Sequence, residues 1–357
     1  MPGAGWARPG SGMDPAGFKK RALLILRLVL CVGLFALLLR QFEAPVLLEA
    51  LGQTATHWPW WLAALGLMFL GLLAGVLRWR DILAAQGLVL PVSQVFSIFF
   101  IGQFFNGFML GACGGDVARA YYVARRTTHR RAEAASTVLV DRAIGLWITI
   151  LVGCLLIAFR PDLFRTRTAT LALAVFMLAL LAGSALAGIV LFRRNMIEHW
   201  PMLQRLEWNT RLGHLFRRLY EAFYLYRNRP GVLARAAFYS VLNLAFLTWS
   251  CIAFARSLHL TVPAVTFFAF FPVITVLAAV PLTPGSLGVR EGFFVMLFRV
   301  AGVENELALA LSLMFYAGGL VWSLFGGLIF LGFSAGSGRR MSEDLDAIQH
   351  EPSEPAP

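Results

Sequence analysis

The chain has 357 residues, of which 59% are hydrophobic and only 14% are charged, and its mean hydropathy is +0.71. A soluble domain carries roughly a quarter charged residues, so this composition excludes a soluble globular protein and indicates a chain built for lipid. The net charge of +12 fits attraction to anionic lipid headgroups better than nucleic-acid binding, because no recognition motif accompanies it.

The chain begins with residues 1–18, whose glycine and proline content predicts disorder. A basic cluster at 19–21 then precedes an apolar run over 22–39. A signal peptide is an alternative for such a start, but the run is long and lacks a small-residue cleavage site before Arg40. We therefore interpret it as an uncleaved first membrane span.

Most of the remaining hydrophobic residues fall in segments long enough to cross the bilayer as helices, which requires roughly 17–25 residues. The predicted full spans are 22–39, 59–77, 137–159, 169–192, 235–255 and 307–333. Two further hydrophobic segments, 93–111 and 264–300, contain or adjoin residues that break helices. The residues expected to shape these breaks are Asn106, Gly114, Gly115, Pro281, Pro284, Gly285 and Gly288.

The distribution of basic residues predicts how the segments cross, because Lys and Arg accumulate in cytoplasmic loops. The basic connections are 78–92, 117–131 and 193–229, and basic clusters also lie near both ends of the chain. If every hydrophobic segment crossed once, neither orientation would place all of these clusters on one side. If 93–111 enters from the cytoplasm and returns, and 264–300 does so from the other face, every cluster becomes cytoplasmic, as do both termini.

The predicted fold class is therefore an all-α polytopic membrane protein with about six full spans and two oppositely oriented re-entrant helical hairpins. Opposed hairpins of this kind are typical of inverted-repeat transporters, whose irregular backbone is enclosed by protein or lines a water-filled cavity. We expect a membrane domain over 19–335, which includes a cytoplasmic interfacial helix over 197–227, and a disordered tail over 336–357. The expected location is the cell (inner) membrane.

Ionisable residues inside the membrane segments are the strongest functional signal, because each costs roughly 2.5–3.5 kcal/mol to insert. The candidates are Asp116, Arg119, Asp141, Arg142, Arg290 and Glu291. Arg27 and Arg299 are weaker candidates, since either side chain can reach a membrane interface.

The Gly-Gly-Asp turn at 114–116 has two interpretations. Asp116 is placed to cap a helix running through Arg125, and the free N–H groups at the start of that helix would favour an anion such as phosphate. Alternatively, the turn only ends one helix and begins the next, with Arg119 at the interface. It is not a nucleotide loop, because neither a GxxxxGK nor a GxGxxG pattern is present.

Asp141 and Arg142 are adjacent on one predicted helix and point about 100° apart, so each needs a partner elsewhere. Either Asp141 takes part in binding or transport, or it pairs with an arginine of a neighbouring segment for structural reasons. Arg290 and Glu291 open a predicted half-helix whose N–H dipoles and cation suit a phosphate-bearing headgroup. The alternative for that stretch is a solvated loop between two ordinary spans.

No catalytic residue, metal site or cofactor is expected. The four cysteines occur singly, and the six histidines are scattered without a nucleophile or a metal-ligand partner. The chain is therefore not predicted to be an enzyme.

Three motifs resemble the transmembrane region of lysylphosphatidylglycerol synthase and its stand-alone relatives, the flippase-like membrane proteins. The motifs are Asn106 with Gly114-Gly115-Asp116 and Arg119, then Asp141-Arg142 followed by Gly145, and finally the stretch from Pro281 to Glu291. The resemblance covers about 20–335 and departs from the family at Ser286, where a second glycine is frequent. It implies a membrane domain that moves, or helps to move, a lipid with a charged headgroup.

The aminoacyl-transferring member of that family carries a large soluble domain after its membrane region. Only about two dozen residues, 334–357, follow the last predicted span here, so aminoacyl transfer is not expected. The leading hypothesis is translocation of a phospholipid or polyprenyl-linked lipid, with Arg119, Arg142 and Arg290 contacting its phosphate. Asp116, Asp141 and Glu291 would hold those arginines or couple protons. The alternative is a non-catalytic partner of a membrane glycosyltransferase or lipid-modifying enzyme, and a membrane-embedded enzyme using the acidic residues is a third.

Overall fold

The computed structural model describes residues 52, 57–108, 114–126, 131–192, 226, 229–279 and 286–336. Within these ranges every element is helical and no strand occurs, as the composition predicts. The predicted disordered segment 1–18 and first span 22–39 lie outside the described residues. So do nearly all of the predicted interfacial helix 197–227 and of the tail.

Five helices of the described part are long and apolar enough to cross a membrane. They are α3 (Trp58–Ala85), α6 (Arg131–Phe159), α8 (Thr168–Phe192), α12 (Pro230–Ser257) and α15 (Asn305–Gly336). Each contains one of the predicted spans, and several extend beyond it because their polar ends continue the helix past the apolar run. A short helix, α7 (Asp162–Arg165), connects α6 to α8.

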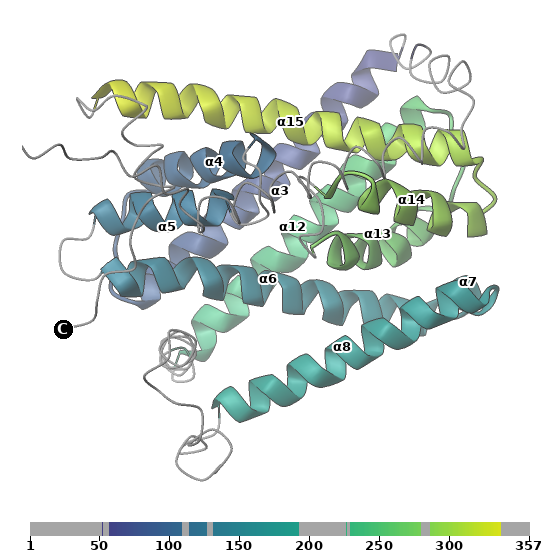
Figure 1. Cartoon of the computed structure of the whole chain (residues 1–357), viewed down its shortest axis with the longest axis horizontal. Coiled ribbons are helices and arrows are strands. Elements are labelled where there is room, and N and C mark those ends of the chain that lie inside the picture. Colours follow the sequence, from purple (N-terminus) through teal and green to yellow (C-terminus); the bar gives the residue numbers. More distant parts are fainter. Residues whose placement is uncertain are drawn as a thin grey trace, which may run out of the picture.

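Four shorter helices form two pairs. The first pair is α4 (Val92–Phe108) with α5 (Gly114–Arg126), and the second is α13 (Ala264–Ala278) with α14 (Val289–Val300). In each pair the two helices pack side by side and antiparallel (Figure 1). Their lengths of 12 to 17 residues correspond to about 18–26 Å, less than the roughly 30 Å of a bilayer core.

The first pair differs in its boundaries from the predicted hairpin 93–111. The incoming helix continues through Asn106 to Phe108, and the returning limb is α5, which occupies much of the expected connection 117–131. The sequence predicted a helix running through Arg125 but assigned it to the cytoplasmic connection 117–131, because this helix is amphipathic rather than uniformly apolar. Its buried face carries Ala118, Tyr122 and Val123 together with Arg119, while Arg125 and Arg126 at its end are exposed.

α3 and α12 cross the centre of the molecule as a tightly packed antiparallel pair (Figure 1). At the crossing, a Cβ added to Gly71 would lie only 3.3 Å from the Leu247 side chain. The Asn243 amide donates to the Gly71 carbonyl at 2.7 Å. Small residues and interhelical hydrogen bonds are the means by which helices associate in lipid, so this crossing can position the elements around it.

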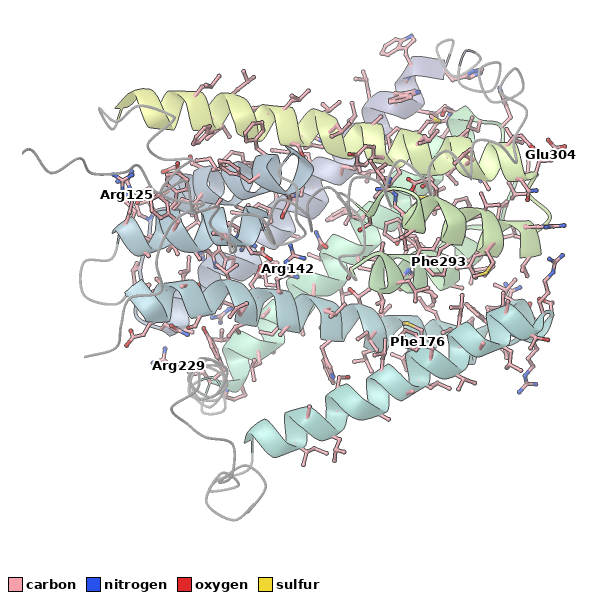
Figure 2. All side chains as sticks on the ribbon, viewed as in Figure 1. Arg125, Arg142, Phe176, Arg229, Phe293 and Glu304 are labelled. Atoms are coloured by element: carbon pink, nitrogen blue, oxygen red, sulfur yellow. The ribbon has the colours of Figure 1, made fainter. Side chains whose placement is uncertain are left out.

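α6 and α15 flank the centre, and each contacts both short pairs. Arg125, at the end of α5, and Glu304, after α14, lie at opposite ends of the molecule, whereas Arg142 of α6 lies between them (Figure 2). The two pairs therefore lie toward opposite ends of the array, and the end of α4 and the start of α14 are directed toward its middle (Figure 1).

Candidate functional site

Five charged side chains from α3, α5 and α6 form one continuous network. Asp141 accepts hydrogen bonds from Arg78 Nε at 2.7 Å and from Arg119 Nη2 at 3.0 Å. Asp116 Oδ2 lies 2.6 Å from Arg142 Nε, and Asp116 Oδ1 lies 4.0 Å from Arg119 Nη1. The order is Arg78, Asp141, Arg119, Asp116, Arg142, so the sign of the charge alternates. Three arginines and two aspartates leave a net charge of +1.

The adjacent residues Asp141 and Arg142 have different partners, as predicted. The Asp141 side chain is 1% exposed and faces α3 and α5, whereas 47% of the Arg142 side chain is exposed. Asp141 therefore pairs with arginines of neighbouring helices, as the structural alternative for this residue predicted. Arg142 has the most exposed side chain of the network, so the network is buried at Asp141 and reaches the surface at Arg142.

Sequence reasoning missed Arg78, which it assigned to a connection after the span 59–77. α3 continues to Ala85, so Arg78 lies inside the helix, and its Nη1 also donates to Ser240 of α12 at 3.1 Å. A signal was present in the sequence. Trp79, Ile82 and Leu83 continue the apolar helical pattern beyond the arginine, and all three are buried.

Arg119 is enclosed by aromatic rings. Its guanidinium carbon lies 4.2 Å from the ring centroid of Trp79 and 4.7 Å from that of Phe99. Gly102 makes room for the side chain, because a Cβ there would lie 2.5 Å from Arg119 Cγ. Cation–π contacts of this kind contribute about 2 kcal/mol when desolvated. These contacts fix Arg119 inside the protein, where it holds Asp116 and Asp141.

The Gly-Gly-Asp start of α5 is fixed by Asn106. The Asn106 side-chain oxygen accepts a hydrogen bond from the Gly115 N–H at 3.1 Å, and a Cβ on Gly115 would lie 2.1 Å from the Gly102 carbonyl oxygen. α5 begins at Gly114, so Asp116 lies in the first turn rather than at the cap expected from the sequence. The physical reason is that the Asn106 side chain already accepts a hydrogen bond from an N–H group at the helix start. The Asp116 carboxylate is therefore free to pair with the arginines.

The start of α14 is a separate, more local arrangement. The Gly288 N–H donates to Glu291 Oε2 at 2.6 Å, while Glu291 Oε1 pairs with Arg290 and accepts from Ser312 of α15 at 3.3 Å. The Arg290 guanidinium also lies 4.7 Å from the Tyr316 ring centroid. Glu291 is fully buried and Arg290 nearly so. This pair is neutral.

Two residues before α14 adopt the left-handed conformation, Ser286 at φ 57° and Gly288 at φ 85°. Ser286 stands where the resembled family often has glycine, and its hydroxyl donates to the Ala278 carbonyl at the end of α13. This hydrogen bond compensates a backbone conformation that glycine adopts without strain. Pro281, Pro284 and Gly285 lie outside the described residues. α13 ends before them.

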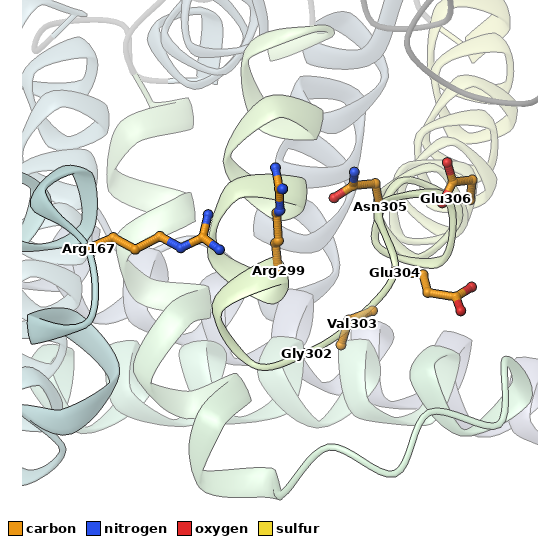
Figure 3. A pocket seen from close by; sticks show the side chains of 7 residues that line it. All are labelled: Arg167, Arg299, Gly302, Val303, Glu304, Asn305 and Glu306. Carbon is orange, nitrogen blue, oxygen red and sulfur yellow. The ribbon is translucent and has the colours of Figure 1, made fainter.

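A hollow of about 420 Å³ lies at the opposite end of the molecule from Arg125. Its walls carry two arginines and two glutamates, and the Arg167 side chain extends toward Arg299 (Figure 3). The lining residues are Arg167, Arg299, Gly302, Val303, Glu304, Asn305 and Glu306. Arg299, a weaker candidate by sequence, is thus an exposed end-of-helix residue rather than part of the buried network. Arg27 lies outside the described residues.

Comparisons with known proteins agree on the kind of chain this is. The model of the family described as "Lysylphosphatidylglycerol synthase TM region" matches residues 24–326, which include both short pairs and the charged network. A curated "UPF0104 membrane protein" of Methanothermobacter thermautotrophicus (strain Delta H) is 27% identical over 266 residues. The alignment covers 68% of this chain and 74% of that protein.

Proposed function

Since the chain belongs to the lysylphosphatidylglycerol synthase TM region family, we propose that it translocates, or helps to translocate, a lipid with a phosphate-bearing headgroup across the bilayer. The observation that carries this proposal is the network with a surplus positive charge whose exposed member is Arg142. Arg142 lies about 8 Å along α6 from the start of the span predicted at 137–159.

A phosphate bound at Arg142 would neutralise the surplus charge of the network. An exposed cation at bilayer depth is costly, by roughly 2.5–3.5 kcal/mol, and a charge-assisted contact with an anion offsets that cost. Asp116 orients Arg142, and Arg119, Asp141 and Arg78 hold Asp116 in place. We assign the headgroup contact to Arg142, because Arg290 of the second pair is already matched by Glu291.

The two short pairs would be re-entrant hairpins entering from opposite faces. Their helices are shorter than the bilayer core, and the pairs occupy opposite ends of one helical array (Figure 1). Arg125 and Arg229 lie at one end of the molecule and Glu304 at the other (Figure 2). Arginines lie at both ends, among them Arg167 and Arg299 beside Glu304, so the proposal of an inner-membrane protein whose first hairpin enters from the cytoplasm rests on the basic connections of the sequence.

A vesicle assay tests the proposal. The purified protein is reconstituted with fluorescent phosphatidylglycerol or polyprenyl phosphate, and the fraction of lipid exposed outside is followed by chemical quenching. We expect translocation above that of empty vesicles, and a decrease of about tenfold or more in Arg142→Gln, as for loss of one charge-assisted contact. Arg160→Gln is the control, because Arg160 pairs with Asp162 in an exposed connection.

Rates equal to those of empty vesicles for both lipids would refute the translocation function. Unchanged rates in Arg142→Gln would refute the assigned headgroup contact. Co-purification of a stoichiometric membrane enzyme, with no intrinsic translocation, would favour the alternative of a non-catalytic partner.

A further inference from the structure

An apolar groove opens between α6, α8 and α12. α8 diverges from α6 along its length (Figure 1), and the space between them measures about 610 Å³, within the roughly 300–1,000 Å³ of ligand sites. The groove is lined by Ala143, Ile144, Leu146, Trp147, Ile148, Ile150, Ser184, Ala185, Ala187, Gly188, Ile189, Leu233 and Ala237. It is therefore a lateral hollow in the helices that surround Arg142.

The lining suits a hydrocarbon chain. Its one hydroxyl, that of Ser184, already donates to the Leu181 carbonyl at 3.0 Å within α8. The α8 wall consists largely of small residues, and a Cβ added to Gly188 would meet no atom within 4 Å. A polar ligand would find few partners along these walls, whereas an alkyl or prenyl chain needs none.

The groove begins beside the exposed cation of the network. Arg142 directly precedes the first lining residue of α6, Ala143. It also shares a helix face with Leu146, one turn further on, and both side chains are exposed. A cation at one end and an apolar channel leading from it complement an amphiphile with an anionic head and a hydrocarbon tail.

We propose that this groove binds a hydrocarbon chain of the anionic lipid whose phosphate contacts Arg142. The proposal rests on the headgroup contact assigned above, but it requires only binding and not translocation. The chain stays on the lipid-facing side between α6 and α8, while the headgroup reaches the network between α5 and α6.

The test uses phosphatidylglycerol with a photoactivatable diazirine near the end of one chain, incorporated into nanodiscs that hold the full-length protein. Cross-linked peptides are identified by mass spectrometry. We expect labelling on the groove-lining residues of α6 and α8, decreased about tenfold by Gly188→Phe, which fills the groove. Gly183→Phe is the matched control: it is on the same helix, its Cβ also meets open space, and it does not line the groove.

The headgroup half of the proposal is tested with a phosphatidylcholine probe that carries the same chain. We expect stronger groove labelling by the phosphatidylglycerol probe, and we expect Arg142→Gln to remove that preference. If Gly188→Phe fails to fold, as judged by gel filtration and thermal unfolding, Ala185→Leu fills the same space from another lining position.

Equal labelling by both probes, unaffected by the groove-filling variants, would mean that bulk lipid occupies the groove and would overturn the proposal. Cross-linking from a photoreactive amino acid placed at Ala185 to another segment of this chain or to a second copy would also overturn it. If vesicles show no translocation while the labelling pattern is as expected, the proposed function fails and the chain-binding groove stands.

Discussion

The two short helix pairs bury charge in different ways. In the first pair, Asp116 and Arg119 of α5 depend on Arg78, Asp141 and Arg142, which come from two other helices. In the second pair, the carboxylate of Glu291 is satisfied by the adjacent Arg290, the nearby Gly288 N–H and one residue of α15. The first arrangement retains a surplus positive charge, and the second is neutral.

This difference favours the first pair as the proposed headgroup site and the second pair as a structural cap. A buried ion pair that is fully matched stabilises a backbone break but offers little to a ligand. A network that has one more arginine than it has aspartates, and whose end at Arg142 is exposed, has charge left for an anion. The comparison therefore directs attention to Arg142, although Arg290 lies in the more distinctive sequence motif.

The largest expected effect is that of Asp141→Asn. This change leaves Arg78 and Arg119 buried beside an uncharged amide, and breaking a buried pair typically costs about 3–5 kcal/mol. The free energy of unfolding in mixed detergent micelles measures the loss. Asp162→Asn, which alters an exposed pair, serves as control and should change little. A loss at Asp141 no larger than the control would show that the network does not stabilise the fold.

Glu291→Gln should cost less, about 1.5–3 kcal/mol, because the amide oxygen still accepts from the Gly288 N–H while the ionic contact to Arg290 is lost. The same unfolding measurement applies. If this variant were as destabilised as Asp141→Asn, the second pair would depend on its buried charges as strongly as the first. The contrast between the two pairs would then fail.

A pair of glycine variants sharpens the comparison through packing. Gly115→Ala places a Cβ 2.1 Å from the Gly102 carbonyl and should destabilise the protein by about 1–3 kcal/mol. Gly292→Ala, on α14, meets no atom within 4 Å, so we expect a gain of about 0.5–1 kcal/mol from helix propensity. Thermal unfolding checks both signs. A stabilising Gly115→Ala would contradict the close contact of α4 with α5.

Much of the fold could be predicted from the sequence, because long apolar runs leave few alternatives to membrane helices. The ends of the helices were less accessible: α3 continues past Arg78, and α5 is too polar to register as a membrane element. Charged candidates were recognisable by their cost in lipid. Their partners were not, because Arg78 and Asp141 are 63 residues apart and meet only through the packing of α3 against α6.

The smallest expected effect concerns the turn before α14. Ser286→Gly relieves a left-handed conformation worth about 1–2 kcal/mol, but it loses the hydrogen bond to Ala278, about 0.5–1.5 kcal/mol, and adds backbone entropy to the unfolded chain. These terms nearly cancel, so its free energy of unfolding should match that of the unmodified protein.

Ser286→Ala separates the two contributions, because it keeps the strained backbone and loses only the hydrogen bond. It should be less stable than the unmodified protein by about 0.5–1.5 kcal/mol. If Ser286→Ala were neutral and Ser286→Gly clearly stabilising, strain would dominate this turn. In that case local hydrogen bonds would not be enough to explain the stability of the second pair. The two pairs would then differ only in their charge, which is neutral in the second pair and positive in the first.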